Sequence, residues 1–212
     1  MRKYIVEFIG TFCLVLTIVV ACNNGATGTI PAISIGLMLM AVVYAGGHIS
    51  GAHYNPAVSL ALLIRKKINV NDFVFYVVAQ ILGSVLASVI GAILISGVAT
   101  GKTPSPMVID IVPAFLAEFI GTFILVWVIQ NVATAKANAG NSFYGMAIGL
   151  TVTSMAFALG PISGGAFNPA VAIGASVAEM FNWANLWVYF VACFGGAAAA
   201  ALTYQQVVGE EA

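Results

Sequence analysis

The chain has 212 residues, of which 61% are hydrophobic and 7% are charged, and its formal net charge is zero. A mean hydropathy of +1.05 excludes a soluble globular domain of this size. The composition indicates an integral, multi-pass membrane protein, so we expect the lipid bilayer, and no nucleic acid, among its partners.

Six apolar runs approach or exceed the length of about 20 residues that crosses the hydrocarbon of a bilayer as a helix. They lie at residues 4–22, 30–48, 73–98, 111–133, 143–160 and 184–207. We therefore predict an all-α membrane protein with six transmembrane helices.

The basic residues are distributed unevenly between the two sides of these spans. Only Lys102 falls on one side, and the other six fall on the opposite side. Because basic loops stay in the cytoplasm, both termini are predicted to be cytoplasmic, in a plasma or inner membrane. The six are Arg2, Lys3, Arg65, Lys66, Lys67 and Lys136.

The N-terminal run has a second interpretation, because a basic start, an apolar stretch and Cys22 together resemble a cleavable lipoprotein signal. Two observations argue against it. Glu7 interrupts the apolar stretch, and the sequence around Glu7 recurs in the middle of the chain, where no signal peptide can lie.

The recurrence reveals an internal repeat. Residues 7–12, Glu-Phe-Ile-Gly-Thr-Phe, return 111 positions later at 118–123, and Asn-Pro-Ala-Val at 55–58 returns 113 positions later at 168–171. The single domain 1–212 thus consists of two repeats, at about 1–102 and about 110–212. Each repeat holds three spans, an odd number, so the second repeat is inserted in the opposite direction.

Each Asn-Pro-Ala begins a segment too short to cross the membrane. Asn is a favoured N-cap and Pro a favoured first helical residue, so helices are predicted at 56–64 and 169–179. Such a helix is about 15 Å long, half the apolar thickness of a bilayer. The inverted repeat brings the two N-termini together near the midplane, which predicts two re-entrant half-helices. The motif residues are Asn55, Pro56, Ala57, Asn168, Pro169 and Ala170.

A glycine-rich, irregular segment precedes each half-helix. Non-helical backbone at this depth is tolerated only where protein covers it or where it lines a water-filled cavity. We therefore expect carbonyl groups of these two segments to face a lumen. The segments are Gly51, Ala52 and His53 in the first repeat, and Gly164, Gly165 and Ala166 in the second.

These features resemble the aquaporin (major intrinsic protein) family over nearly the full chain. The resemblance rests on residues 47–58, on the second Asn-Pro-Ala and on the paired Glu7 and Glu118. It implies a passive channel for small uncharged solutes, assembled as a homotetramer with one pore in each subunit. It also implies that Asn55 and Asn168 donate amide N–H groups to a single file of solute.

Physical reasoning leads to the same class of function. Two helix N-termini that meet at the midplane create a positive region in a medium of low dielectric constant, which repels cations, including hydronium. Neutral solutes with lone pairs are not repelled. An oxygen bound from both sides by the Asn side chains also interrupts a proton relay along the file.

Glu7 and Glu118 are candidates for function because carboxylates inside spans are costly. They could accept hydrogen bonds from the irregular loops, as the resemblance implies, or carry protons in a secondary transporter. Their symmetric duplication favours the supporting role, which we also assign to His48. His48 and His53 flank the first half-helix, where solvation or a backbone contact is expected rather than a metal. No metal site, cofactor or catalytic group is predicted.

One position departs from the family. The residue after the second Asn-Pro-Ala is usually Arg in water-selective and glycerol-conducting members, and here it is Val171. Spacing from the motifs places the other selectivity-filter positions at Ile35, Ala156 and Gly165. Such a ring has no charge and no donor and is wide on two sides, so water, glycerol, urea and neutral arsenic or boron species all remain candidates. A dewetted gate is the opposing possibility.

Overall fold

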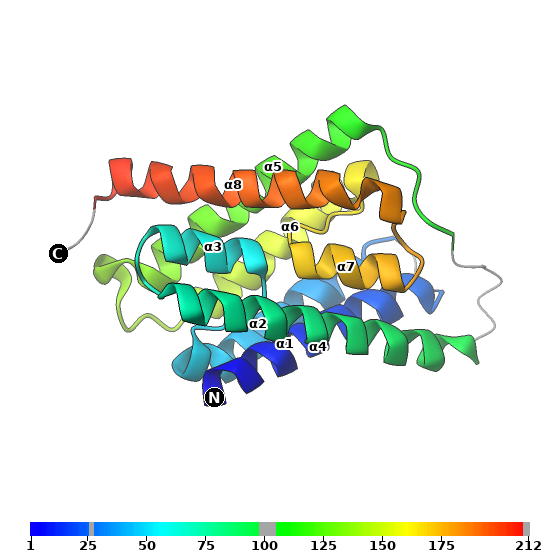
Figure 1. Cartoon of the computed structure of the whole chain (residues 1–212), viewed down its shortest axis with the longest axis horizontal. Coiled ribbons are helices and arrows are strands. Elements are labelled where there is room, and N and C mark those ends of the chain that lie inside the picture. Colours follow the sequence, from blue (N-terminus) through cyan, green and yellow to red (C-terminus); the bar gives the residue numbers. More distant parts are fainter. Residues whose placement is uncertain (26–27, 98–104, 210–212) are drawn as a thin grey trace.

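The computed structural model describes residues 1–25, 28–97 and 105–209, and within them six long apolar helices are able to cross a membrane (Figure 1). This confirms the predicted fold class. Lys102, the basic residue assigned to the second side of the membrane, lies outside the described residues. The six helices are α1 (Arg2–Asn23), α2 (Ile30–Ser50), α4 (Val70–Ser96), α5 (Ile111–Ile129), α6 (Tyr144–Ser163) and α8 (Leu186–Val207).

Shorter helical turns complete the spans and connections. Helix α5 continues into the π-helical turn η1 (Gln130–Thr134), and the 3₁₀ turn η2 (Lys136–Asn138) follows. A second 3₁₀ turn, η3 (Trp183–Asn185), leads into α8. Figure 1 shows the start of α1 and the end of α8 toward the same end of the bundle, as an even number of spans requires.

Two half-helices lie within the bundle. Helix α3 (Pro56–Ile64) has the predicted bounds, whereas α7 (Pro169–Val177) ends two residues before the predicted Glu179. The reason is a left-handed turn, because Glu179 has a φ of 57° and cannot continue a right-handed helix. Lys66 turns the chain in the same way after α3, with a φ of 56°.

Glycines let the long helices of each repeat pack closely. A Cβ atom on Gly83 of α4 would collide with the backbone carbonyl of Phe8 in α1. The equivalent contact in the second repeat joins Gly196 of α8 to the carbonyl of Phe119 in α5. Small residues at such crossings allow the backbone contacts that hold helices together in lipid.

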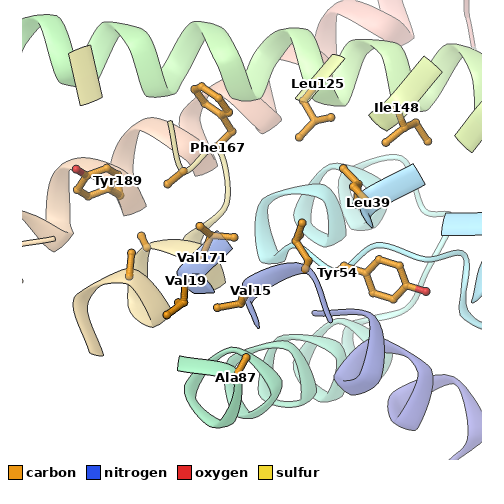
Figure 2. Packing of buried hydrophobic residues seen from close by; sticks show 14 of the residues in the cluster. Val15, Val19, Leu39, Tyr54, Ala87, Leu125, Ile148, Phe167, Val171 and Tyr189 are labelled. Carbon is orange, nitrogen blue, oxygen red and sulfur yellow. The ribbon is translucent and has the colours of Figure 1, made fainter. Parts of the chain in front are cut away.

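The largest buried cluster lies where the two repeats meet. Figure 2 shows Tyr54 and Phe167, from the loops before the half-helices, in one cluster with Val15 of α1 and Val171 of α7. Each of these four side chains is at most 4% exposed. The loops are therefore part of the core, and the half-helices begin from fixed positions.

Candidate functional site: a pore between two half-helices

The two Asn side chains cap their own half-helices and join the repeats. The Oδ1 atom of Asn55 accepts from the backbone N–H of Ala57 at 2.8 Å, and that of Asn168 accepts from Ala170 at 2.9 Å. One N–H of each carboxamide is donated across the repeat interface. Asn55 donates to the carbonyl of Phe167 at 2.8 Å, and Asn168 donates to the carbonyl of Tyr54 at 2.9 Å.

The residues before the two Asn residues adopt an unusual backbone conformation. Tyr54 has a φ of 49° and Phe167 a φ of 47°, in the left-handed region that bulky side chains rarely occupy. Because the carbonyls of these same two residues accept the Asn hydrogen bonds, the conformation matches a functional constraint. The surrounding structure must hold both residues in place.

The Glu7 carboxylate supplies much of that constraint in the first repeat. Its Oε1 atom accepts from the hydroxyl of Ser50 at 2.7 Å and from the backbone N–H of His53 at 2.9 Å. Its Oε2 atom accepts from the backbone N–H of Tyr54 at 2.6 Å and from the side chain of Gln80 at 2.9 Å. A fully buried carboxylate thus organises the loop before α3.

Glu118 repeats this arrangement before α7. Its Oε1 atom accepts from the hydroxyl of Ser163 at 2.7 Å and from the N–H of Ala166 at 2.9 Å. Its Oε2 atom accepts from the N–H of Phe167 at 2.6 Å, and the thiol of Cys193 lies 3.5 Å away. The two repeats differ only in this last partner, where the thiol replaces the stronger amide donor of Gln80.

Glycine one helical turn after each Glu makes room for an aromatic ring. A Cβ atom on Gly10 would collide with the ring of Tyr54, and one on Gly121 would collide with the ring of Phe167. The spacing explains the repeated Glu-Phe-Ile-Gly motif, since residues three apart share one helix face. One face of α1 or α5 therefore binds the loop backbone through Glu and its aromatic side chain through Gly.

A tyrosine from the last helix of each repeat fastens the start of each loop. The hydroxyl of Tyr76 donates to the carbonyl of Ser50 at 2.6 Å, and that of Tyr189 donates to the carbonyl of Ser163 at 2.6 Å. Both serines end a long helix, α2 or α6. The loops are therefore held at both ends.

The smaller of the two cavities that the loops before the half-helices line most fully has a volume of about 80 Å³ and includes both Asn residues. The four positions predicted for the filter and both Asn residues line it. His53 from the first glycine-rich segment and all three residues of the second segment, 164–166, line it too. Its walls are otherwise mostly apolar, with Leu14, Ile18, Leu39, Val152 and Ala175 among them. The four filter positions that line it are Ile35, Ala156, Gly165 and Val171.

Gly51 and Ala52 lie apart from that cavity. They line a larger cavity of about 320 Å³, together with His48 and with Asn138 and Asn141 of the segment after α5. The second predicted segment therefore lines the smaller cavity as a whole, whereas the first segment is split between the two cavities. His48 is exposed in the last turn of α2, and within the described residues no hydrogen bond joins it to the loop.

His53 is buried within the supporting network. Its Nδ1 atom lies 3.0 Å from the hydroxyl of Ser59, and its ring meets the ring of Tyr76 edge-on with centroids 4.9 Å apart. In the part of the chain that the structure describes, no group of three His, Cys, Asp or Glu side chains is placed to hold a metal. The contacts with Ser59 and Tyr76 make His53 a packing and hydrogen-bonding residue of the loop.

Several residues of this site were not recognised from the sequence. Gly10 and Gly121 belong to the repeated Glu-Phe-Ile-Gly-Thr-Phe motif, and Tyr76 and Tyr189 are separated by the same 113 positions as the two Asn-Pro-Ala motifs. Their equivalence was the available signal, but their roles depend on contacts between distant segments. Gln80 had no such signal, because its counterpart is a cysteine.

Comparison with known proteins agrees with this geometry. A model of the major intrinsic protein family matches residues 1–204. The chain belongs to the major intrinsic protein family. Among relatives, it is 37% identical over 223 residues to glycerol uptake facilitator protein-like 6 of Lactiplantibacillus plantarum, with 100% of both chains covered. It is 38% identical over 219 residues to aquaporin NIP3-1 of Arabidopsis thaliana, covering 96% of this chain and 66% of that relative.

A solved structure has the same fold. The X-ray structure of the aquaglyceroporin from Plasmodium falciparum superposes with a TM-score of 0.83 at 26% identity, covering 98% of this chain and 96% of that one. The likeness extends through both repeats, so this major intrinsic protein has the family architecture throughout its described residues.

Proposed function

We propose that this chain is a passive channel for water and small neutral solutes such as glycerol, with the smaller cavity as part of its conduction path. The observation that carries the proposal is the position of Asn55 and Asn168 on one cavity. Each carboxamide has two N–H groups, and one bonds to the opposite loop. The second remains to bind a solute oxygen. The family consists of channels rather than enzymes.

Exclusion of ions and protons is proposed to arise at the same place. The N-termini of α3 and α7 meet where the Asn side chains cross, so their partial positive charges add in an apolar surrounding. A cation loses its hydration there and finds no carboxylate to replace it, because the oxygens of Glu7 and Glu118 accept hydrogen bonds from loop N–H groups. A neutral solute does not meet this barrier.

We propose that Ile35, Ala156, Gly165 and Val171 form the selectivity filter. All four line the smaller cavity, and none carries a charge or a side-chain donor. Such a ring selects by size more than by hydrogen bonding, which favours neutral polar solutes as large as glycerol or larger, including urea and neutral arsenic or boron acids. The name of the Lactiplantibacillus relative, a glycerol uptake facilitator, supports glycerol as one solute in this range.

The transporter alternative finds less support. A proton-carrying carboxylate must exchange its proton with a solvated path, whereas Glu7 and Glu118 are fully buried and each accepts hydrogen bonds at both oxygens. Protonation would remove acceptors from the backbone N–H groups of Tyr54 or Phe167. The supporting role therefore remains our proposal for both residues.

We further propose a homotetramer in a plasma or inner membrane, with both termini in the cytoplasm. The family resemblance supports the tetramer, and the distribution of basic residues along the sequence supports the orientation. Light scattering of the transport-competent detergent complex measures the assembly. A protein mass near 21.9 kDa, that of one chain, would contradict the tetramer.

The filter is tested by flux through proteoliposomes containing the wild type, Val171→Arg or Val171→Met. The Arg variant adds bulk and donors, and the Met variant adds bulk alone. We expect Val171→Arg to reduce the flux of solutes larger than glycerol far more than that of water. Unchanged large-solute flux in both variants would show that position 171 does not line the constriction.

A further inference from the structure

An open cavity lies between the start of α1 and the end of α2, at one rim of the bundle. Its volume is about 900 Å³, and its charged and polar lining is basic, with Arg2, Lys3 and His48 on its walls. Among the described residues, no Asp or Glu lines it. The apolar residues on its walls are Met1, Ile5, Val6 and Ile49. Positive charge therefore lies beside aliphatic surface in one cavity.

Two contacts hold the ends of α1 and α2 together at this rim. The carboxylate of Glu7 in α1 accepts from the hydroxyl of Ser50 in α2 at 2.7 Å. A Cβ atom on Gly46 of α2 would lie only 2.7 Å from a methyl carbon of Val6 in α1. Each of the three basic residues is within about one helical turn of one of these contacts. The basic rim is therefore a fixed feature of the fold.

Arg2 provides the uncompensated positive charge of the cavity. The ammonium of Lys3 lies 2.7 Å from the carboxylate of Asp72 in α4, which balances its charge. Asp72 also accepts from the hydroxyl of Tyr4 at 2.8 Å. In the part of the chain that the structure describes, no hydrogen bond or ion pair joins the exposed Arg2 guanidinium to another residue. Its five N–H donors remain available to a ligand.

An aliphatic stripe runs along α1 below this charge. Arg2, Ile5 and Ile9 are three and four residues apart, so they share one face of the helix. Ile5 is 52% exposed and Ile9 is 51% exposed, and Ile49 of α2 is 44% exposed beside them. In a membrane-spanning helix, a basic residue at the end lies among the lipid headgroups and the apolar residues lie among the acyl chains. The stripe therefore matches an amphipathic molecule aligned with α1.

We propose that this cavity binds an anionic phospholipid, of which phosphatidylglycerol is an example. The guanidinium of Arg2 and the imidazole of His48 hold the phosphate, and an acyl chain lies along Ile5 and Ile9. A planar guanidinium binds two phosphate oxygens at once, and basic pockets between transmembrane helices bind anionic headgroups. The first turn of α1 adds backbone donors, because no side chain caps this helix. The ammonium of a zwitterionic lipid gains nothing from a basic lining.

The lipid site adjoins the pore without obstructing it. His48 lines both this cavity and the larger cavity that contains Gly51 and Ala52. No residue of the lipid site lines the smaller cavity, which contains Asn55 and Asn168. In the proposed orientation the rim faces the cytoplasm, whose membrane leaflet carries anionic lipids. The lipid inference is independent of the solutes proposed above.

Native mass spectrometry measures binding to the purified full-length channel in detergent, titrated with phosphatidylglycerol or with phosphatidylcholine of the same acyl chains. We expect tighter binding of phosphatidylglycerol. Arg2→Gln should weaken that binding about fivefold, the contribution of one basic side chain near anionic lipid, and leave phosphatidylcholine binding unchanged. His48→Ala should also weaken it. Lys67→Gln removes an exposed positive charge outside this cavity, so it is the matched control and should bind as the wild type does.

Three binding results would overturn the site. Equal affinity of the wild type for the two lipids would show that the basic lining does not select charge. Equal losses in Arg2→Gln and Lys67→Gln would reduce the preference to a general attraction between basic protein and anionic lipid. Displacement of phosphatidylglycerol by millimolar inorganic phosphate would assign the cavity to free anions, because a bound lipid is also held by its acyl chain.

Thermal unfolding provides a second measurement, because a ligand that binds the folded state raises the melting temperature. Phosphatidylglycerol should raise that of the wild type more than phosphatidylcholine does, and the difference should shrink in Arg2→Gln. A difference as large in Arg2→Gln as in the wild type would contradict the role of Arg2. The melting temperature without added lipid checks that the variant is folded.

Glycerol flux separates this inference from the proposed function. Arg2→Gln in phosphatidylcholine liposomes should conduct glycerol as the wild type does, because Arg2 lines neither pore cavity. Loss of the lipid preference with wild-type flux supports the site and leaves the channel function intact. A wild type that prefers phosphatidylglycerol but conducts no glycerol would contradict the proposed function alone.

Discussion

The carboxamide of Asn55 donates a hydrogen bond of 2.8 Å to the backbone carbonyl of Phe167, a residue 112 positions away in the other repeat. Its counterpart joins Asn168 to Tyr54. The side chains that begin the half-helices therefore also fix the distance between the repeats. A change at either Asn should affect capping and the pore together.

We predict that Asn55→Ala lowers stability by about 1 kcal/mol through loss of the N-cap and also lowers water and glycerol flux. The matched control is Asn69→Ala, because Asn69 caps α4 through the N–H of Asp72 at 2.8 Å but lies away from both pore cavities. It should lose similar stability and keep its flux. Equal flux losses in the two variants, measured by stopped flow on equal amounts of reconstituted protein, would assign the effect to capping alone.

Glu118→Gln should be strongly destabilising even though it removes a charge. The new amide group can accept at only one position, so an N–H of Ala166 or Phe167 loses its acceptor, at about 1–3 kcal/mol for each buried donor. Thermal unfolding in detergent measures the loss. Asp110→Asn, an exposed acid with no side-chain capping bond, is the control and should unfold like the wild type.

A wild-type melting temperature in Glu118→Gln would contradict the supporting role. The transporter interpretation would instead be favoured if the variant were as stable as the wild type and if flux depended on the proton gradient in the wild type but not in the variant.

Gly121→Ala should displace the ring of Phe167 and with it the carbonyl that binds Asn55. Overpacking of this kind costs about 1–3 kcal/mol. Gly10→Ala should act in the same way on Tyr54. Gly97→Ala is the control, since a Cβ atom there meets nothing within 4 Å. Wild-type stability and flux in both Gly121→Ala and Gly10→Ala would show that the two loops tolerate movement of the aromatic rings.

Arg65 fastens the far end of α3. Its guanidinium carbon lies 3.6 Å from the ring centroid of Tyr204 in α8, and its Nη1 atom donates to the hydroxyl of Thr134 in η1 at 2.6 Å. A desolvated cation–π contact contributes about 2 kcal/mol, so Arg65→Met should lower the melting temperature measurably. Lys67→Met removes a positive charge from an exposed neighbouring position and should not. Equal melting temperatures would mean that the stacked geometry contributes nothing.

The sequence predicted those parts of the site that local chemistry determines. Asn-Pro begins a helix through capping and a fixed φ, so the starts of α3 and α7 were predicted correctly. Spacing from the same motifs predicted Ile35 as a filter position, and Ile35 lines the same cavity as Val171. The end of α7 was wrong by two residues, because a left-handed turn at Glu179 has no distinct local signal.

Contacts between distant segments could not be predicted in this way. The ring of Tyr54 fills the space beside Gly10 only once α1 and the loop are packed, and Gln80 reaches Glu7 across 73 positions. The π-helical turn at Gln130–Thr134 likewise has no sequence pattern. Residues that act through packing were therefore missed, whereas residues that act through local backbone chemistry were found.

The central claim is that solute crosses passively while protons do not. Proteoliposomes containing the wild type and a pH-sensitive dye measure both at once, with an osmotic glycerol gradient and with proton and sodium gradients imposed or collapsed by ionophores. We predict a glycerol flux that depends only on the glycerol gradient, with proton leak equal to that of empty liposomes. A glycerol flux that requires either ion gradient, or a proton leak that rises with the amount of protein, would contradict the account.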